Sequence, residues 1–231
     1  MARYVEELVS QQVQRSEIAR KREEEAGQVC GTPVVTISRG MGSGARIVAR
    51  KLADDLHWSL WDKEIMEAMA EDGDVSQRVL EAFDEKAVSE IELFARGALG
   101  DHEMSGFMYA RRLARAVASI ARLGNAIILG RGANYLLPEA LNVRIDASDE
   151  VRIQNMINYE SMTRQEAEKK IHASDKERQS FAVRTFGKQR VAAFKYDLRI
   201  WMDDFSPSDA AEIIKAAIKM KCKPRAQQDS A

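Results

Sequence analysis

A glycine-rich stretch, SRGMGSGAR, has the composition of a phosphate-binding loop. Gly40, Gly42 and Gly44 stand at alternate positions, which lets the backbone turn tightly and point its N–H groups at phosphate oxygens. A β-branched run at 34–38 precedes the stretch and helical spacing at 45–57 follows it, a position that favours a phosphate cradle over an ordinary glycine turn. We therefore assign nucleotide binding to Ser38, Arg39, Gly40, Met41, Gly42, Ser43, Gly44, Ala45 and Arg46.

The loop departs from the common pattern G-x-x-x-x-G-K-[ST] in ways that bear on its chemistry. Arg39 stands at the first glycine, Ala45 at the lysine and Arg46 at the hydroxyl residue. The phosphate lysine and the hydroxyl that binds Mg²⁺ are both missing. Arg46 supplies positive charge and can contact phosphate with two nitrogens, but its guanidinium cannot bind a metal ion.

A second motif, GRGANY, follows the apolar run at 126–129. Arg131 lies there between Gly130 and Gly132. An arginine flanked by glycines at the end of a strand is poorly explained as a core residue and is well placed to bind a phosphate. We assign Arg131 to catalysis and to substrate binding, with Asn134 as a further polar contact.

A third candidate region is basic. Residues 152–199 hold 11 basic and 6 acidic residues, whereas residues 62–103 hold 13 acidic and 4 basic ones. Within it, we expect Arg178 and Arg184 to stabilise the charge on a transferring phosphate. A solvated helix face is the alternative for both arginines.

Strand and helix patterns alternate around these motifs. Apolar strands are predicted at 34–38, 58–62, 126–129, 143–147 and 198–202, and helices at 45–57, 63–70, 76–99, 110–123, 150–159, 163–176 and 207–219. The fold class is therefore α/β, with a five-stranded, mainly parallel sheet covered by helices on both faces. Because ligands bind at the carboxyl ends of such strands, the motifs lie where a site should form.

The ends of the chain differ from this pattern. Residues 1–30 read as a helical arm, which could pack on the domain, pair with another subunit or fray. The principal α/β domain is expected at 31–221, with a helical acceptor-side region at 63–123 and a lid-like basic region at 160–195. Residues 222–231 are polar and are expected to be disordered. Since the first core strand begins at Val34, we expect a fragment without residues 1–28 to fold.

Three of these stretches resemble the cytidylate kinase-like family. ISRGMGSGARIVARKLADDLHWSLWDKEI looks like its opening, which has a lysine-free glycine loop, a G-S-G-x-R core and a Y/W-D-K-E segment; GRGANYLL and SDKERQSF match it further on. The resemblance covers about 34–219 and implies a nucleoside-monophosphate-kinase-like fold of the P-loop type. It also implies ATP as the donor, with Mg²⁺, and CMP or dCMP as the acceptor.

The resemblance also bears on Asp62, Lys63 and the contact to the nucleotide base. It puts Asp62 and Lys63 on the acceptor side, where Asp62 could order the attacking phosphate or bind Mg²⁺ through water; from its position alone, Asp62 is equally a helix N-cap. Cytidylate kinases read G-R-D where this chain has Gly132, and their aspartate helps to hold the cytidine. The base contact is thus altered here, and Asn134 could replace it.

Phosphoryl transfer to a nucleotide is the function that these observations favour. A nucleotide-binding regulatory module and a kinase for a non-nucleotide metabolite remain alternatives. A net charge of −1 argues against nucleic acid as a partner, and no apolar run approaches the roughly 20 residues that cross a membrane. We therefore expect small nucleotides as partners and a cytoplasmic location, with the N-terminal helix as the candidate surface for self-association.

Overall fold

The computed structural model describes residues 2–25, 33–71, 79–80, 83–98 and 107–221. The tail expected at 222–231 lies outside these residues, as does the junction at 26–32. All five predicted strands and most of the predicted helices fall within them, so the α/β architecture can be compared element by element.

The described strands form one parallel sheet in the order β2-β3-β1-β4-β5. This confirms the predicted five-stranded parallel sheet. β1 lies at its centre, with Thr36 aligned with Ile128 of β3 and Asn142 of β4. The strands are β1 (Val34–Arg39), β2 (Ser59–Trp61), β3 (Ala126–Leu129), β4 (Leu141–Asp146) and β5 (Leu198–Trp201).

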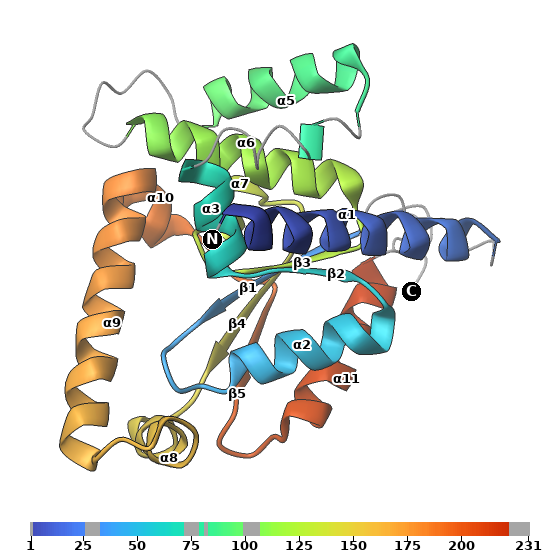
Figure 1. The fold of residues 1–231 in the computed structure, drawn as a ribbon. Coiled ribbons are helices and arrows are strands. Elements are labelled where there is room, and N and C mark those ends of the chain that lie inside the picture. The colour runs from blue at the N-terminus through green and yellow to red at the C-terminus, as the bar shows by residue number, and fades with distance from the viewer. Residues whose placement is uncertain (1, 26–32, 72–78, 81–82, 99–106, 222–231) are drawn as a thin grey trace, which may run out of the picture.

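Helices cover both faces of the sheet (Figure 1). α2 and α11 lie on one face, α3 and α6 on the other, α1 packs along the edge strand β2 with residues in both core layers, and α9 runs past the carboxyl ends of the strands. The helix bounds are α1 (Ala2–Glu25), α2 (Ala45–Leu56), α3 (Lys63–Glu71), α5 (Glu85–Gly97), α6 (Phe107–Leu123), α7 (Ala133–Leu136), α8 (Asp149–Glu160), α9 (Arg164–Phe186), α10 (Lys188–Ala193) and α11 (Pro207–Lys221).

Two helices differ clearly from their predicted bounds. Within the stretch predicted as helix at 76–99, Val79 and Leu80 are helical, and α5 begins at Glu85, where the Asp84 side chain accepts a hydrogen bond from Ala87 N and caps it; residues 76–78, 81–82 and 99 lie outside the described ranges. The helix predicted at 163–176 continues to Phe186, and its end coincides with Gly187. α9 is therefore long enough to pass the whole carboxyl edge of the sheet.

The core consists of two apolar layers separated by the sheet. β3 is buried at all four positions, with Ala126 and Ile128 facing the α3 and α6 layer and Ile127 and Leu129 facing the α2 and α11 layer. Alternate strand residues point to opposite faces, so a strand covered on both sides is apolar throughout. This burial holds the carboxyl ends of β1 and β3, and the loops after them, in fixed positions.

The N-terminal helix α1 packs on the domain. Its Val9 and Ser16 are fully buried, and Gln12 Oε1 accepts a hydrogen bond of 2.8 Å from Leu60 N of the edge strand β2. Ser16 Oγ also donates to Ser59 Oγ at 2.7 Å. Of the three arrangements left open, the structure shows the first, and this packing argues against the expectation that a fragment without residues 1–28 would fold. Any subunit contact through α1 would have to use its outward face.

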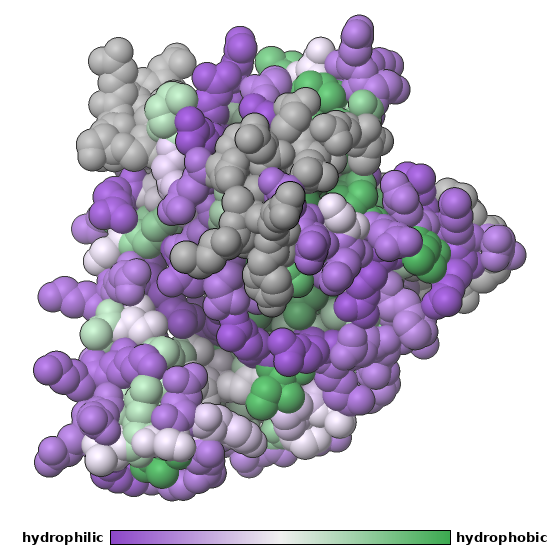
Figure 2. Space-filling view, in the orientation of Figure 1, coloured by the Kyte–Doolittle hydropathy of each residue, from purple (hydrophilic) through white to green (hydrophobic). Residues whose placement is uncertain are grey.

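The surface seen in Figure 2 is mainly hydrophilic, and its apolar side chains form small separate areas. Exposed large apolar residues in the described part of the chain include Leu93 and Tyr159, which come from different helices. No helix among the described residues is both long and apolar enough to cross a membrane.

Candidate functional site

The glycine loop connects β1 to α2 and carries a row of free backbone donors. Among the described residues, the N–H groups of residues 41–46 have no hydrogen-bond acceptor in the protein. Six consecutive free amides at the start of a twelve-residue helix form a site that favours an anion, because the N-terminal end of a helix carries partial positive charge. The loop can therefore hold a phosphate through its backbone alone.

The carbonyl groups of the same loop are held by α8. Arg152 Nε donates to Met41 O at 2.7 Å, and Asn155 Nδ2 donates to Gly42 O at 2.8 Å. A Cβ at Gly42, where φ is +77°, would stand 2.6 Å from the Arg152 carbonyl oxygen, so only glycine fits this contact. With its carbonyls tied to α8, the loop is held in one conformation.

Arg152 also links the loop to α9. Its guanidinium donates to Asp149 at 3.0 Å and to Asp175 of α9 at 2.6 Å, and the residue is 8% exposed. α8 begins directly after β4 because Ser148 caps it, which places Arg152 in the first turns beside the loop. The link that Arg152 makes between the loop and α9 was not predicted from the sequence. Ser148, a helix-capping residue just after a predicted strand, is the local signal that places Arg152 there.

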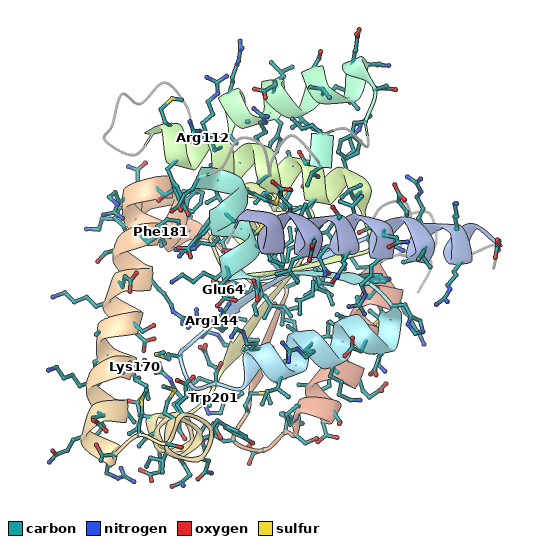
Figure 3. All side chains as sticks on the ribbon, viewed as in Figure 1. Glu64, Arg112, Arg144, Lys170, Phe181 and Trp201 are labelled. Carbon is teal, nitrogen blue, oxygen red and sulfur yellow. The ribbon has the colours of Figure 1, made fainter. Side chains whose placement is uncertain are left out.

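A cavity of about 450 Å³ lies beside the loop, between the carboxyl edge of the sheet and α9. Figure 3 shows Arg144 on the sheet and Phe181 on α9, both of which line it, and the surface in this area is mainly hydrophilic in Figure 2. Five cationic side chains and two carboxylates line the cavity, an excess of positive charge that suits an anionic ligand. They are Arg39, Lys63, Arg131, Arg144, Arg178, Asp175 and Glu177.

Arg131 reaches this cavity from the turn between β3 and α7. Its side chain is 13% exposed, forms an ion pair with Glu67 of α3 and lies 5.3 Å from the ring centre of Phe181. Its Nε is buried and has no hydrogen-bond partner among the described residues. Burial lowers the pKa of Arg131, and the charge of Arg178 lowers it further. Arg131 is thus a partly unsatisfied cation on the cavity wall; its role as a phosphate ligand stays a prediction.

Gly132 and Asn134 occupy the same turn. A Cβ at Gly132 would stand 2.2 Å from Cε2 of Phe186, because the Phe186 ring fills the space that a side chain at residue 132 would need. Asn134 is buried and lines the cavity, and its Oδ1 accepts a hydrogen bond from Ser38 Oγ at 3.2 Å. Its Nδ2 has no acceptor within hydrogen-bond distance in the described residues. The Phe186 ring therefore excludes an acidic side chain at residue 132, and Asn134 is the polar side chain that this turn places at the cavity.

Arg178 and Arg184 of α9 have different surroundings. Arg178 lines the cavity, and its Nη1 donates to Arg39 O at 2.7 Å. Burial lowers its pKa, partly offset by the nearby charge of Asp175. Arg184 is exposed and does not line the cavity. The structure thus brings Arg178, but not Arg184, together with the other predicted residues.

Arg46 is held by two carboxylates. Its Nη2 lies 2.8 and 2.9 Å from the two oxygens of Glu64 and 3.4 Å from Asp62 Oδ2. The hydrogen bonds that Arg46 donates to Glu64 raise the pKa of Arg46. Partial burial opposes ionisation of Glu64, but the hydrogen bond from Arg46 and the positive charge of Arg46 act against it, and the pKa of Glu64 is lowered. The charge of Arg46 is therefore neutralised in part, and its side chain does not line the cavity.

Asp62 and Lys63 lie at the start of α3. Asp62 Oδ1 accepts from Glu64 N at 3.1 Å and Ile65 N at 3.3 Å, which is the helix-capping role. Burial raises the pKa of Asp62. Lys63 lines the cavity, and its Nζ is 3.9 Å from Glu67. Lys63 is thus placed toward a ligand in the cavity, whereas Asp62 acts on the backbone of α3 and on Arg46.

Arg144 is a cavity residue that the sequence analysis missed. It lies on β4, and its guanidinium binds Asp146 at 2.7 Å. Burial opposes its charge, but the hydrogen bond to Asp146 raises the pKa of Arg144. Two opposite charges at alternate positions of an apolar strand point to one face, and this spacing could have revealed the pair.

The fold and the site together define a parallel α/β protein of the P-loop kinase type, with a glycine loop before α2 and an arginine-lined cavity beside it. The model of the cytidylate kinase-like family matches residues 34–204, and the chain belongs to that family. This membership supports a kinase-type enzyme that acts on nucleotides. Among curated proteins, none is similar enough to be matched.

Two solved structures are similar to this chain. An uncharacterized protein from Eubacterium ventriosum is 23% identical and has a TM-score of 0.61, covering 82% of this chain and 99% of its own. TT1252 from Thermus thermophilus is 12% identical with a TM-score of 0.42, covering 84% of this chain and 99% of its own. The first likeness supports the fold and does not bear on the substrate.

Proposed function

We propose that this protein transfers a phosphoryl group from ATP to a nucleoside monophosphate, with CMP or dCMP as the first acceptors to test. The observation that carries the proposal is the arginine-lined cavity at the same edge of the sheet as the free loop amides: Ser38 and Arg39, which lead into the loop, line it. Two phosphate sites next to each other are what a phosphotransferase needs, since donor and acceptor must meet in line.

The residues divide into two groups in this proposal. The loop amides of residues 41–46 bind the β-phosphate of ATP, with Arg46 adding charge nearby. Arg131 binds the acceptor phosphate, together with Lys63 and Asn134. Arg178 stabilises the charge that spreads over the oxygens of the transferring group. No general base is required, because the acceptor phosphate is already anionic.

Mg²⁺ accompanies ATP in this proposal. In proteins it keeps several waters and is bound by substrate phosphates with one or two carboxylates. No group of His, Cys, Asp and Glu in the described part of the chain could hold a metal ion, and Asp62 and Glu64 are bonded to Arg46. We therefore assign no side chain to Mg²⁺; when bound with ATP, it neutralises phosphate charge.

Nucleotide binding without turnover is the second candidate. Two observations favour it: Ala45 replaces the phosphate lysine, and Arg46 is partly neutralised by Glu64. The same glycine loop would then bind ATP, and the cavity would bind a second nucleotide without reaction.

One experiment separates the two candidates. ADP release from ATP is measured with CMP, dCMP, UMP, AMP and non-nucleotide phosphates as acceptors, and ATP binding is measured in parallel by calorimetry. Stimulation by a nucleoside monophosphate supports the kinase. ATP binding with no stimulation by any acceptor supports the binding protein, and stimulation by a non-nucleotide acceptor alone would replace the proposed substrate.

A further inference from the structure

Arg39 belongs to the glycine loop in sequence but to the cavity in space. It ends β1, at the position of the first glycine in the common pattern. Its side chain lines the cavity, and its Nη1 lies 2.9 Å from where a Cβ would stand at Gly130. Gly130 belongs to the turn that carries Arg131, so Arg39 extends from the donor loop toward the proposed acceptor site.

The guanidinium of Arg39 has no ionic partner of its own. Among the described residues, its side chain forms no hydrogen bond and no ion pair. Burial, followed by the charges of Arg178 and Arg46, lowers the pKa of Arg39 to about 10. Asp62 and Glu64 offset these effects in part, but both are bonded to Arg46. Buried charges in proteins are normally paired, so this environment is completed by an anion.

Arg39 also lies between the two groups of residues in the proposed function. Arg178, which reaches from α9, donates to the Arg39 carbonyl at 2.7 Å, and Arg46 lies close enough on the other side to act on its charge. The loop itself has no lysine, because Ala45 stands at that position. Between the glycine loop and the cavity, Arg39 therefore provides the positive charge that a lysine at position 45 would otherwise provide.

We propose that Arg39 is a catalytic residue that binds the transferring phosphoryl group and supplies the charge that the loop lacks at Ala45. This inference rests on the proposed phosphoryl transfer. In that reaction an oxygen of the acceptor phosphate attacks the γ-phosphorus of ATP and forms the new P–O bond. The bond from the γ-phosphorus to the β,γ-bridging oxygen breaks, and its electron pair remains on ADP. Arg39 contacts the γ-phosphoryl oxygens as their charge is redistributed.

The test compares Arg39→Gln and Arg39→Lys with the control Arg50→Gln, which removes an exposed arginine from α2 outside the site. Two quantities are measured on the full chain: the affinity for inorganic pyrophosphate, by calorimetry, and kcat with the best acceptor. We expect Arg39→Gln to weaken pyrophosphate binding by at least about tenfold and to lower kcat by about a hundredfold or more. Arg39→Lys keeps the charge but loses the planar fork, so intermediate losses are expected. Arg50→Gln should change neither quantity.

Pyrophosphate affinity tests the role of Arg39 and kcat tests the proposed kinase activity, so failure of one can be told from failure of the other. Absence of turnover in the unaltered chain would count against the kinase, whereas the pyrophosphate comparison would still report on the anion site at Arg39. Equal pyrophosphate affinity in Arg39→Gln and in the unaltered chain would overturn the role of Arg39, whatever the turnover. Unfolding temperature is recorded for each variant, and if Arg39→Gln does not fold, Arg39→Lys decides: unchanged affinity and unchanged kcat would then reject the proposal.

Discussion

Arg46 and Glu64 are joined through one nitrogen and both carboxylate oxygens, at 2.8 and 2.9 Å, across the space between α2 and α3. Both side chains are more than half exposed, at 52% and 69%. Such exposed pairs contribute only about 0.2–1 kcal/mol, so the pair can separate at little cost when a phosphate binds. If the loop binds ATP as proposed, Glu64 competes with it for the charge of Arg46.

This competition predicts that Glu64→Gln tightens ATP binding by about two- to fivefold, or ~0.4–1 kcal/mol, because it releases Arg46. Calorimetric titration with ATP measures the change. Glu90→Gln, which breaks a similar pair with Arg122 on α6, is the matched control and should have no effect on ATP affinity. The gain should vanish when Arg46→Gln is added; a gain that persists in the double variant would show that Glu64 acts on ATP directly.

Arg152 should matter for both stability and nucleotide binding. Arg152→Gln leaves Asp175 without its partner and Met41 O without a donor, so we expect the free energy of unfolding to fall by about 3 kcal/mol. ATP affinity should fall by about tenfold or more, because a loosened loop must be ordered again on binding. Chemical denaturation and calorimetry measure the two effects.

The control for this prediction is Arg164→Gln, which breaks an exposed pair with Glu150 at the neighbouring helix start. It should cost at most about 1 kcal/mol. Similar losses in the two variants would mean that the buried contacts of Arg152 do not stabilise the loop.

Gln12 makes a contact that its neighbour Gln11 does not. Gln12→Ala removes the acceptor for Leu60 N, and we expect a loss of about 1–2 kcal/mol in the free energy of unfolding. Gln11 is exposed on the same helix, so Gln11→Ala should be nearly neutral. Equal values for the two variants in urea denaturation would indicate that α1 separates from β2 in solution.

Gly132 and Phe186 should be coupled. Gly132→Ala places a Cβ in contact with the Phe186 ring and also forces alanine to φ 69°, whereas Gly44→Ala imposes a similar φ of 77° with open space around it. We expect Gly132→Ala to cost about 1–3 kcal/mol more than Gly44→Ala, the typical range for overpacking. Urea denaturation measures both variants.

Adding Phe186→Ala to Gly132→Ala should recover about 1–2 kcal/mol relative to the sum of the two single changes, because the double variant removes the clash. Simple additivity would show that backbone strain at residue 132, and not the ring, requires glycine there.

The main features of the fold were predictable because local patterns determine them. β3 is fully apolar because it is covered on both faces, and the glycine loop follows β1 directly. The length of α9 was not predicted, since the apolar spacing weakens in residues 177–186, where polar residues such as Glu177, Arg178 and Gln179 line the cavity. The position of Asp84 as a cap explains why α5 starts later than its helix-forming residues suggested.

The site was predictable only in part. Arg131 and Arg178 could be assigned because each lies in a motif with its own local signal. The pairing of Arg46 with Glu64, and the contact between Gly132 and Phe186, join residues from separate elements, and no local spacing records either of them. The direction of the Arg39 side chain likewise depends on the turn after β3, which approaches β1 only in the folded sheet.

The contact between Gln12 and Leu60 protects one edge of the sheet from pairing with another chain. A parallel sheet has two edge strands, and an uncovered edge can pair with another chain and lead to aggregation. At β2, the Gln12 side chain takes the place that a carbonyl of a sixth strand would take. At β5, the opposite edge, Arg199 is 62% exposed and its charge discourages pairing with a second chain. One edge is thus protected by a helix and the other by charge, so loss of α1 would expose β2 alone to strand addition.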